Sequence, residues 1–147
     1  MGNETILLIG ELCHAEEDTA GGTITPGDLV EFNGTTGKLQ RHSTANGNAA
    51  AMFAKEDDLQ GNGIDVDYTV GKLVQYLTPV LGDQINALLT TSQTIKKGNF
   101  LSSQGDGKLK KYVVSSGEPD YIKAIVLMAL EDKTTTSSVA RIVGRVV

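Results

Sequence analysis

Few residues in this chain carry a thiol or an imidazole, the side chains most suited to nucleophilic and acid–base catalysis near neutral pH. The sequence holds one cysteine, Cys13, and two histidines, His14 and His42. A thiol beside an imidazole is a common nucleophilic pair, but adjacent residues on a strand point to opposite faces, so Cys13 and His14 would pair poorly. A Cys13–His42 pair stays open as a hypothesis for a Cys-dependent hydrolase. The simpler interpretation is a small buried thiol and two surface histidines.

The sequence offers little for a metal or a cofactor. A structural zinc site needs four Cys or His ligands, and only three such residues are present. Calcium prefers oxygen ligands, and five oxygen-bearing side chains gather around Gly61 and Gly63, but not at EF-hand spacing, so we expect a solvated acidic loop. No glycine-rich turn continues as a phosphate loop. We therefore expect no catalytic, cofactor-binding or metal-binding residues. The five oxygen-bearing residues are Asp57, Asp58, Asn62, Asp65 and Asp67.

Composition and charge restrict the partners. The net charge is −5 and aromatic residues make up 5% of the chain. Nucleic-acid binding depends on cationic side chains and on aromatic stacking, so we expect no nucleic-acid partner. An oligonucleotide-binding barrel is thus a weaker alternative, although the chain has one group of lysines. We expect that group to be a solvated hairpin face, and its members are Lys96, Lys97, Lys108, Lys110 and Lys111.

The first residues of the chain, the length of its apolar runs and its single cysteine indicate the compartment in which it is made. One cysteine excludes an internal disulfide framework. No apolar run approaches the roughly 20 residues that span a bilayer, and the first residues lack the cationic start of a signal peptide. We expect a soluble protein without a membrane partner, made in a reducing cytoplasm.

Turn signals recur at short spacing along the whole sequence. Glycine is frequent, with 17 residues, and the stretches between the glycine-containing turns are rich in Val, Ile, Thr, Tyr and Phe. Short strands separated by such turns indicate an all-β sandwich or barrel. At 147 residues the chain has the length of one domain. We predict a single β domain over residues 13–147, preceded by residues 1–12 as an N-terminal arm or a first strand.

An internal repeat supports the all-β prediction. Residues 24–42 and 95–112 share a Gly-Asp or Gly-Asn turn, a strand, a glycine-rich hairpin and a returning Lys-Leu pair. Each copy is followed by an apolar stretch that ends in acids, at residues 51–57 and 126–132. Ala51 to Ala54 favours helix by propensity, but the repeat indicates a strand there. Two copies predict a small pseudo-symmetric β-barrel, or paired sheets, made of two related β-units, with short helical turns possible.

Three further segments are expected to be strands. Residues 65–77, with Tyr68 and Tyr76, would form a strand pair that bridges the two units. Residues 84–89 fit a strand better than a helix capped by Asp83, because the segment is short and lies between turns. Residues 139–147 alternate well, with Ile142 and Val146 on one face, and predict a strand that closes the barrel.

The repeated unit resembles the head decoration proteins of tailed phages, the group of the lambda decoration protein and its β-tulip relatives. The likeness lies in residues 24–39, 68–89 and 95–109, in that order and spacing. It implies a β-tulip fold and a cement protein that stabilises contacts between major capsid subunits on the outer surface of the virion. It also implies a homotrimer at threefold or quasi-threefold positions, with no catalysis and no cofactor. The alternatives are another virion component, a head fibre or a head–tail joining subunit.

In such families an N-terminal arm often pairs with the coat protein. The candidate capsid-binding arm here has a short β-prone run, which could add a strand to an exposed sheet edge. Its deletion would then weaken capsid binding more than folding. The alternative is that residues 6–9 are the first core strand. The arm consists of Met1, Gly2, Asn3, Glu4, Thr5, Ile6, Leu7 and Leu8.

Overall fold

Five strands of the chain close into a small barrel. The computed structural model describes residues 4–10, 13–113 and 124–147, and it is all-β apart from short helical turns such as η1 (Asp58–Gln60). The last barrel strand pairs with the first, so the sheet closes on itself, as the sequence predicted. In order around the barrel the strands are β7 (Gln84–Leu89), β10 (Leu109–Lys111), β9 (Phe100–Ser103), β11 (Ile125–Ala129) and β13 (Ala140–Val146).

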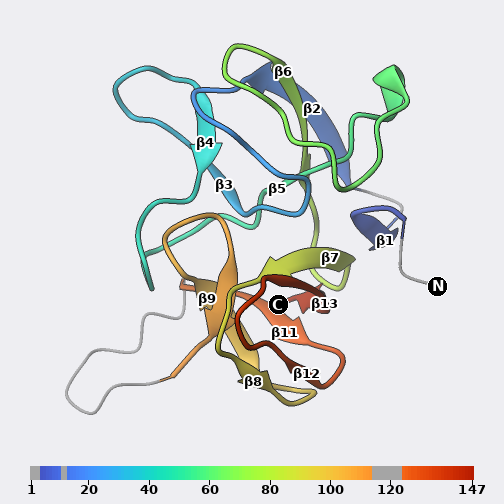
Figure 1. Ribbon diagram of the computed structural model, residues 1–147, viewed down its shortest axis with the longest axis vertical. Coiled ribbons are helices and arrows are strands. Elements are labelled where there is room, and N and C mark those ends of the chain that lie inside the picture. Colours follow the sequence, from blue (N-terminus) through green and yellow to red (C-terminus); the bar gives the residue numbers. More distant parts are fainter. Residues whose placement is uncertain (1–3, 11–12, 114–123) are drawn as a thin grey trace.

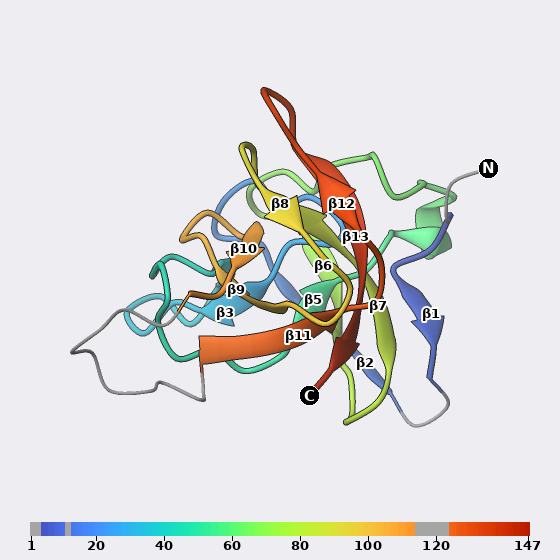
Figure 2. The same ribbon diagram turned by 90° about the horizontal axis from the view of Figure 1, so that it is seen from below.

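Smaller sheets surround the barrel. In Figure 1 a three-stranded sheet and a hairpin lie above it, whereas a short strand pair lies at the opposite end. Figure 2 shows the same parts from below. The sheet is β2 (His14–Thr19), β6 (Leu73–Thr78) and β5 (Phe53–Ala54), the hairpin is β3 (Val30–Phe32) and β4 (Leu39–Arg41), and the short pair is β8 (Thr94–Ile95) and β12 (Lys133–Thr134).

The core consists of two clusters of buried side chains. The larger cluster fills the barrel, with Leu127 and Ile142 among its fully buried members. It continues into the smaller sheets through Leu29, Phe53 and Leu77. The second cluster draws its members from the smaller sheets and their loops. The barrel and the smaller sheets therefore share apolar side chains and do not form separate cores.

Three turns of the fold have the same construction. Each contains a glycine with positive φ, followed by Asp or Asn whose side chain accepts a hydrogen bond from the backbone N–H three residues earlier. A positive φ at the third turn position favours glycine, which explains the residue type. The glycines are Gly27, Gly82 and Gly98, with φ of 96°, 94° and 93°. The bonds run from Thr25 N to Asp28 Oδ2 (2.8 Å), Val80 N to Asp83 Oδ2 (3.0 Å) and Lys96 N to Asn99 Oδ1 (2.9 Å).

Each of these turns also binds a strand in the same way. The glycine N–H donates to a strand carbonyl, and the N–H of that same strand residue donates to the carbonyl of the Asp or Asn. The strand residues are Ala54, Ala129 and Val146, with N···O distances of 2.8–3.0 Å. Ala54 and Ala129 are equivalent positions of the sequence repeat, so the structure confirms the two related units. The third turn, at residues 80–83, is not followed by a hairpin, so it lies outside the sequence repeat.

Two strand predictions are confirmed and two need correction. Residues 84–89 form strand β7 rather than a helix, and β13 closes the barrel, with Ile142 and Val146 buried. Residues 65–77 do not form a strand pair: only β6 is a strand, and Tyr68 makes an isolated bridge to Ile24. The strand expected over residues 51–54 is reduced to β5. The first shortfall contains a turn at Gly71, and the second begins in a run of three alanines, a residue type with weak strand propensity.

Candidate functional site

The two histidines differ in their surroundings. His14 is exposed on β2, as expected. His42 is 2% exposed, which corrects the prediction that it lies on the surface. Its Nδ1 lies 2.7 Å from Ser103 Oγ and its Nε2 lies 3.1 Å from the carbonyl of Asn48. The ring therefore joins the β4 strand, the β9 strand and the loop after residue 42, and serves as a structural link.

Cys13 does not converge with either imidazole. Its thiol lies 3.7 Å from the backbone carbonyl of His14, which is a weak contact. Partial burial and the nearby carboxylate of Asp83 raise the pKa of this thiol above its ordinary value, which keeps it in the less nucleophilic form. The nitrogens of His42 are engaged elsewhere, so a Cys13–His42 pair does not form in this structure.

Three carboxylates of the acidic loop contact other side chains of the same chain. Asp57 accepts a hydrogen bond from Gln75, Asp58 pairs with Lys55 at 2.6 Å, and Asp65 lies 3.3 Å from Arg141. Within residues 4–10, 13–113 and 124–147, no group of three His, Cys, Asp or Glu side chains is placed to hold a metal ion. No helix in this part of the chain is long and apolar enough to cross a membrane.

One carboxylate is fully buried between two cations. The side chain of Asp28 is inaccessible, and its oxygens lie 2.7 Å from Arg41 Nε and 2.8 Å from Lys108 Nζ. The Lys108 side chain is 12% exposed, which corrects the expectation that this lysine belongs to a solvated hairpin face. The Asp28–Lys108 ion pair joins the first repeat unit to the β9–β10 hairpin of the second, so it contributes to the fold.

The residues of the predicted arm have different environments. Met1, Gly2 and Asn3 lie outside the described residues. Glu4 and Thr5 are exposed, whereas Ile6 is fully buried in the barrel core and Leu7 and Leu8 are half-buried. Strand β1 (Leu7–Ile9) pairs with the edge of β7 beside the point where β10 joins it. Residues 7–9 thus form a strand on the barrel sheet, and Ile6 before them lies in the core.

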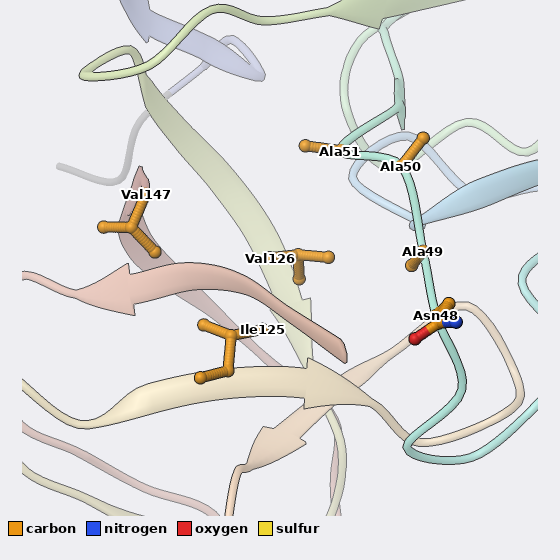
Figure 3. Close-up of a pocket in the computed structure, with 7 residues that line it drawn as sticks. All are labelled: Asn48, Ala49, Ala50, Ala51, Ile125, Val126 and Val147. Carbon is orange, nitrogen blue, oxygen red and sulfur yellow. The ribbon is translucent and has the colours of Figure 1, made fainter. Parts of the chain in front are cut away.

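A shallow groove crosses one side of the barrel. Its volume is about 590 Å³. Figure 3 shows an extended alanine segment on one side and apolar side chains of β11 and the C-terminal residue on the other. None of the described side chains that line it is charged, so the groove offers mainly apolar contact area. The lining residues are Asn48, Ala49, Ala50, Ala51, Ile125, Val126 and Val147.

A row of neighbouring side chains runs across the outside of the barrel. Phe100 lies opposite Met128, and Met128 lies opposite Arg145. The row continues on one side to Tyr112, whose N–H donates to the Phe100 carbonyl at 2.8 Å. Phe100 is 44% exposed. We call Tyr112, Phe100, Met128 and Arg145 the barrel row. Aromatic residues, Met and Arg are the types enriched at protein–protein interfaces, and the sequence alone did not reveal that they adjoin.

The comparisons with known proteins bear on the fold. No protein-family model matches the sequence, and no curated protein is significantly similar to it. The structure is similar to the crystal structure of the head fibre gp8.5 N base in bacteriophage phi29. The TM-score is 0.59 at 12% sequence identity, and the match covers 92% of this chain and 95% of the other. At that identity the likeness establishes a shared fold over nearly the whole of both chains.

Proposed function

We propose that this chain is a structural subunit of a tailed-phage virion, attached to the outer surface of the head as the base of a head fibre. The observation that carries the proposal is the fold shared with the phi29 head fibre base over 92% of this chain. The match also takes in 95% of that base, so the shared fold extends over nearly all of both chains.

The role that we propose is mechanical and non-enzymatic. The partner is the major capsid protein, and copies of the chain also contact one another, as a homotrimer at threefold or quasi-threefold positions of the shell. Binding that buries on the order of 1,000 Å² per contact is sufficient for a specific complex. Several copies bound together gain further affinity through their effective concentration. No cofactor, nucleic acid or membrane takes part in this mechanism.

A decoration (cement) protein is the second candidate. The pattern of residues 24–39, 68–89 and 95–109 resembles that group. Both candidate functions require the chain to lie on the phage head, but they differ in the number of copies per particle. A cement protein must occupy most of the equivalent sites on the shell to stabilise it, whereas a fibre base needs to occupy fewer.

The test is the amount and place of this protein in purified particles. Virions of the phage that encodes the chain would be purified on a density gradient, and the ratio of the chain to the major capsid protein would be measured by quantitative mass spectrometry. We expect the chain in the particle fraction, with density on the outside of the head in electron cryomicroscopy. Absence from intact particles would refute both candidates. A ratio close to one would favour decoration over the fibre base.

A further inference from the structure

Charge is divided unevenly between the two parts of the fold. Residues 1–78, which include the three-stranded sheet and the β3–β4 hairpin, hold twelve acidic and four basic residues, a formal charge of −8. Residues 79–147, which include all five strands of the closed barrel, hold six acidic and nine basic residues, a formal charge of +3. The two values add to the net charge of −5. In Figure 1 the three-stranded sheet and the hairpin of the first part lie above the barrel, and β1 lies beside it. The negative charge of these sheets and the positive charge of the barrel half therefore make the chain an electrostatic dipole.

The barrel row is the part of the positive half best suited to contact a protein. Its apolar centre is Phe100 and Met128, and Arg145 adjoins Met128 on the same outer surface. Lys110 on β10, two residues before Tyr112, which directly follows that strand, faces the same side. Arg145 is exposed, and neither it nor Lys110 forms an ion pair with any described residue. The surface therefore combines contact area with positive charge that no described carboxylate pairs with.

The negative half has a surface of complementary character on the β2–β6 pair. Glu17 lies opposite Gln75 and Thr19 opposite Leu73, so these side chains share one face. Glu17 and Ala15 are exposed, and Leu73 is 58% exposed. Glu17 has no ion pair among residues 4–10, 13–113 and 124–147. We call Ala15, Glu17, Leu73 and Gln75 the acidic face.

We propose that the barrel row of one copy of this chain docks on the acidic face of a second copy. Arg145 would meet Glu17, and Phe100 and Met128 would cover Leu73. The second copy is the occupant that the charges favour, because each molecule carries both a cationic apolar surface and an anionic apolar surface. A contact between two different surfaces is heterologous, and such contacts close into rings when the rotation between copies permits.

This inference rests on the self-association within the proposed function and assigns surfaces to it. It can be tested on the purified chain without particles, so its failure would leave the virion role standing. Sedimentation velocity would be measured from roughly 0.05 M to 0.5 M salt, a range over which the screening length falls several-fold. We expect association at low salt that weakens as salt increases. A chain that stays monomeric at low salt and high protein concentration would overturn the proposal.

Charge reversal tests which surfaces meet. Arg145→Glu and Glu17→Arg should each weaken association by about tenfold or more, since each turns an attraction into a repulsion. The double variant, Arg145→Glu with Glu17→Arg, should recover most of the loss. Lys38→Glu is the matched control, because Lys38 is exposed and lies on neither surface, and it should associate as the wild type does. Single variants without effect, or a double variant without recovery, would refute the assignment of surfaces.

Discussion

The buried carboxylate of Asp28 links the two repeat units of the fold. It is fully buried and receives hydrogen bonds from Thr25 N, Arg41 and Lys108. Asp28→Asn keeps the turn but removes the negative charge between two cations. We expect the free energy of unfolding to fall by about 2–4 kcal/mol, because an unpaired buried ion costs more than the pair contributes. Urea denaturation followed by circular dichroism measures this change.

Asp83 provides the matched control for that substitution. It occupies the same turn position and accepts the same bond from Val80 N, but no ion pair to a described residue is formed. Asp83→Asn should therefore cost less than about 1 kcal/mol. Equal losses in Asp28→Asn and Asp83→Asn would show that the turn, and not the buried charge, accounts for the effect.

The lowered pKa of Glu31 predicts how the free energy of unfolding changes at low pH. Burial acts to raise the pKa of this carboxyl, but hydrogen bonds from Ser43 and Gln40 and the nearby His42 outweigh it, and the pKa lies below the ordinary 4.5. A lowered folded-state pKa contributes stability above pH 4.5, which is lost as the pH falls through the folded value. Glu31→Gln should therefore flatten the decline in unfolding free energy below pH 4.5. Superimposable pH profiles of the two proteins would contradict this.

At the residue scale, local pairing of side chains could be predicted from the sequence better than their burial. Strand geometry predicted that Cys13 and His14 would pair poorly, and the simpler interpretation of His14 as a surface residue is confirmed. The burial of His42 and Lys108 did not follow, because it depends on Ser103 and Asp28, which are 61 and 80 residues away in the chain. Polar residues become buried where distant partners satisfy them, and one sequence does not identify such partners.

The three glycine turns make a prediction at the scale of elements. Gly27 and Gly98 have nearly the same φ, but a Cβ on Gly98 would meet nothing within 4 Å. A Cβ on Gly27 would lie 2.7 Å from Arg141 Nη1 and 3.1 Å from the Asn86 carbonyl. Gly98→Ala should cost about 1–2 kcal/mol for the positive φ, and Gly27→Ala about 1–3 kcal/mol more for the overlap. Thermal denaturation of both variants measures the difference.

Strand β1 tests how far the N-terminal segment belongs to the fold. Ile6 is fully buried, and its carbonyl accepts a bond from Asn86 N at 2.8 Å. Ile6→Ala should reduce the free energy of unfolding by about 2–5 kcal/mol. Ile9→Ala is the control, because Ile9 is 59% exposed and its loss should stay within about 0.5 kcal/mol. Deletion of residues 1–8 would therefore weaken folding, and a separate effect on capsid binding needs a deletion that ends before Ile6.

Elements with regular alternation were the ones that the sequence predicted well. Residues 139–147 alternate over a full strand length, and residues 84–89 are bounded by turns, so both were correctly assigned. The segment 65–77 has tyrosines in a strand-like context, but its first half is held by turns and a single bridge at Tyr68. Pairing of such a loop is decided by tertiary contacts, which propensity does not capture.

At the scale of the whole molecule, the repeat predicted a barrel but not that only one of the two units would supply strands to it. The second unit supplies β9, β10 and β11 to the barrel, whereas the first unit forms the smaller sheets with β3, β4 and β5. Both units keep the same turn and the same docking bonds. What differs is the set of distant strands that complete each sheet, β7 and β13 in one case and β2 and β6 in the other. These long-range pairings leave no local mark in the sequence.

Because the two parts share apolar side chains, the molecule should unfold as one unit. Arg141 strengthens the connection: from the barrel strand β13 it donates to the carbonyls of Pro26 at 3.0 Å and Ile64 at 2.6 Å. In the wild type, native-state hydrogen exchange should give the same opening free energy for Val30 N–H and Ala129 N–H, one in each part. Different values would show two independent units.

The variant Arg141→Met should break this agreement. Without the two hydrogen bonds, the loops that bear Pro26 and Ile64 lose their attachment to the barrel, so the smaller sheets should open at a lower free energy than the barrel. The difference between the amides of Val30 and Ala129 should be about 1–3 kcal/mol, the scale of two charge-assisted bonds from a half-buried guanidinium. Arg145→Met, on the same strand but exposed, should leave the two amides in agreement. Equal opening of both parts in Arg141→Met would mean that the shared core, through Leu29, Phe53 and Leu77, is sufficient to couple them.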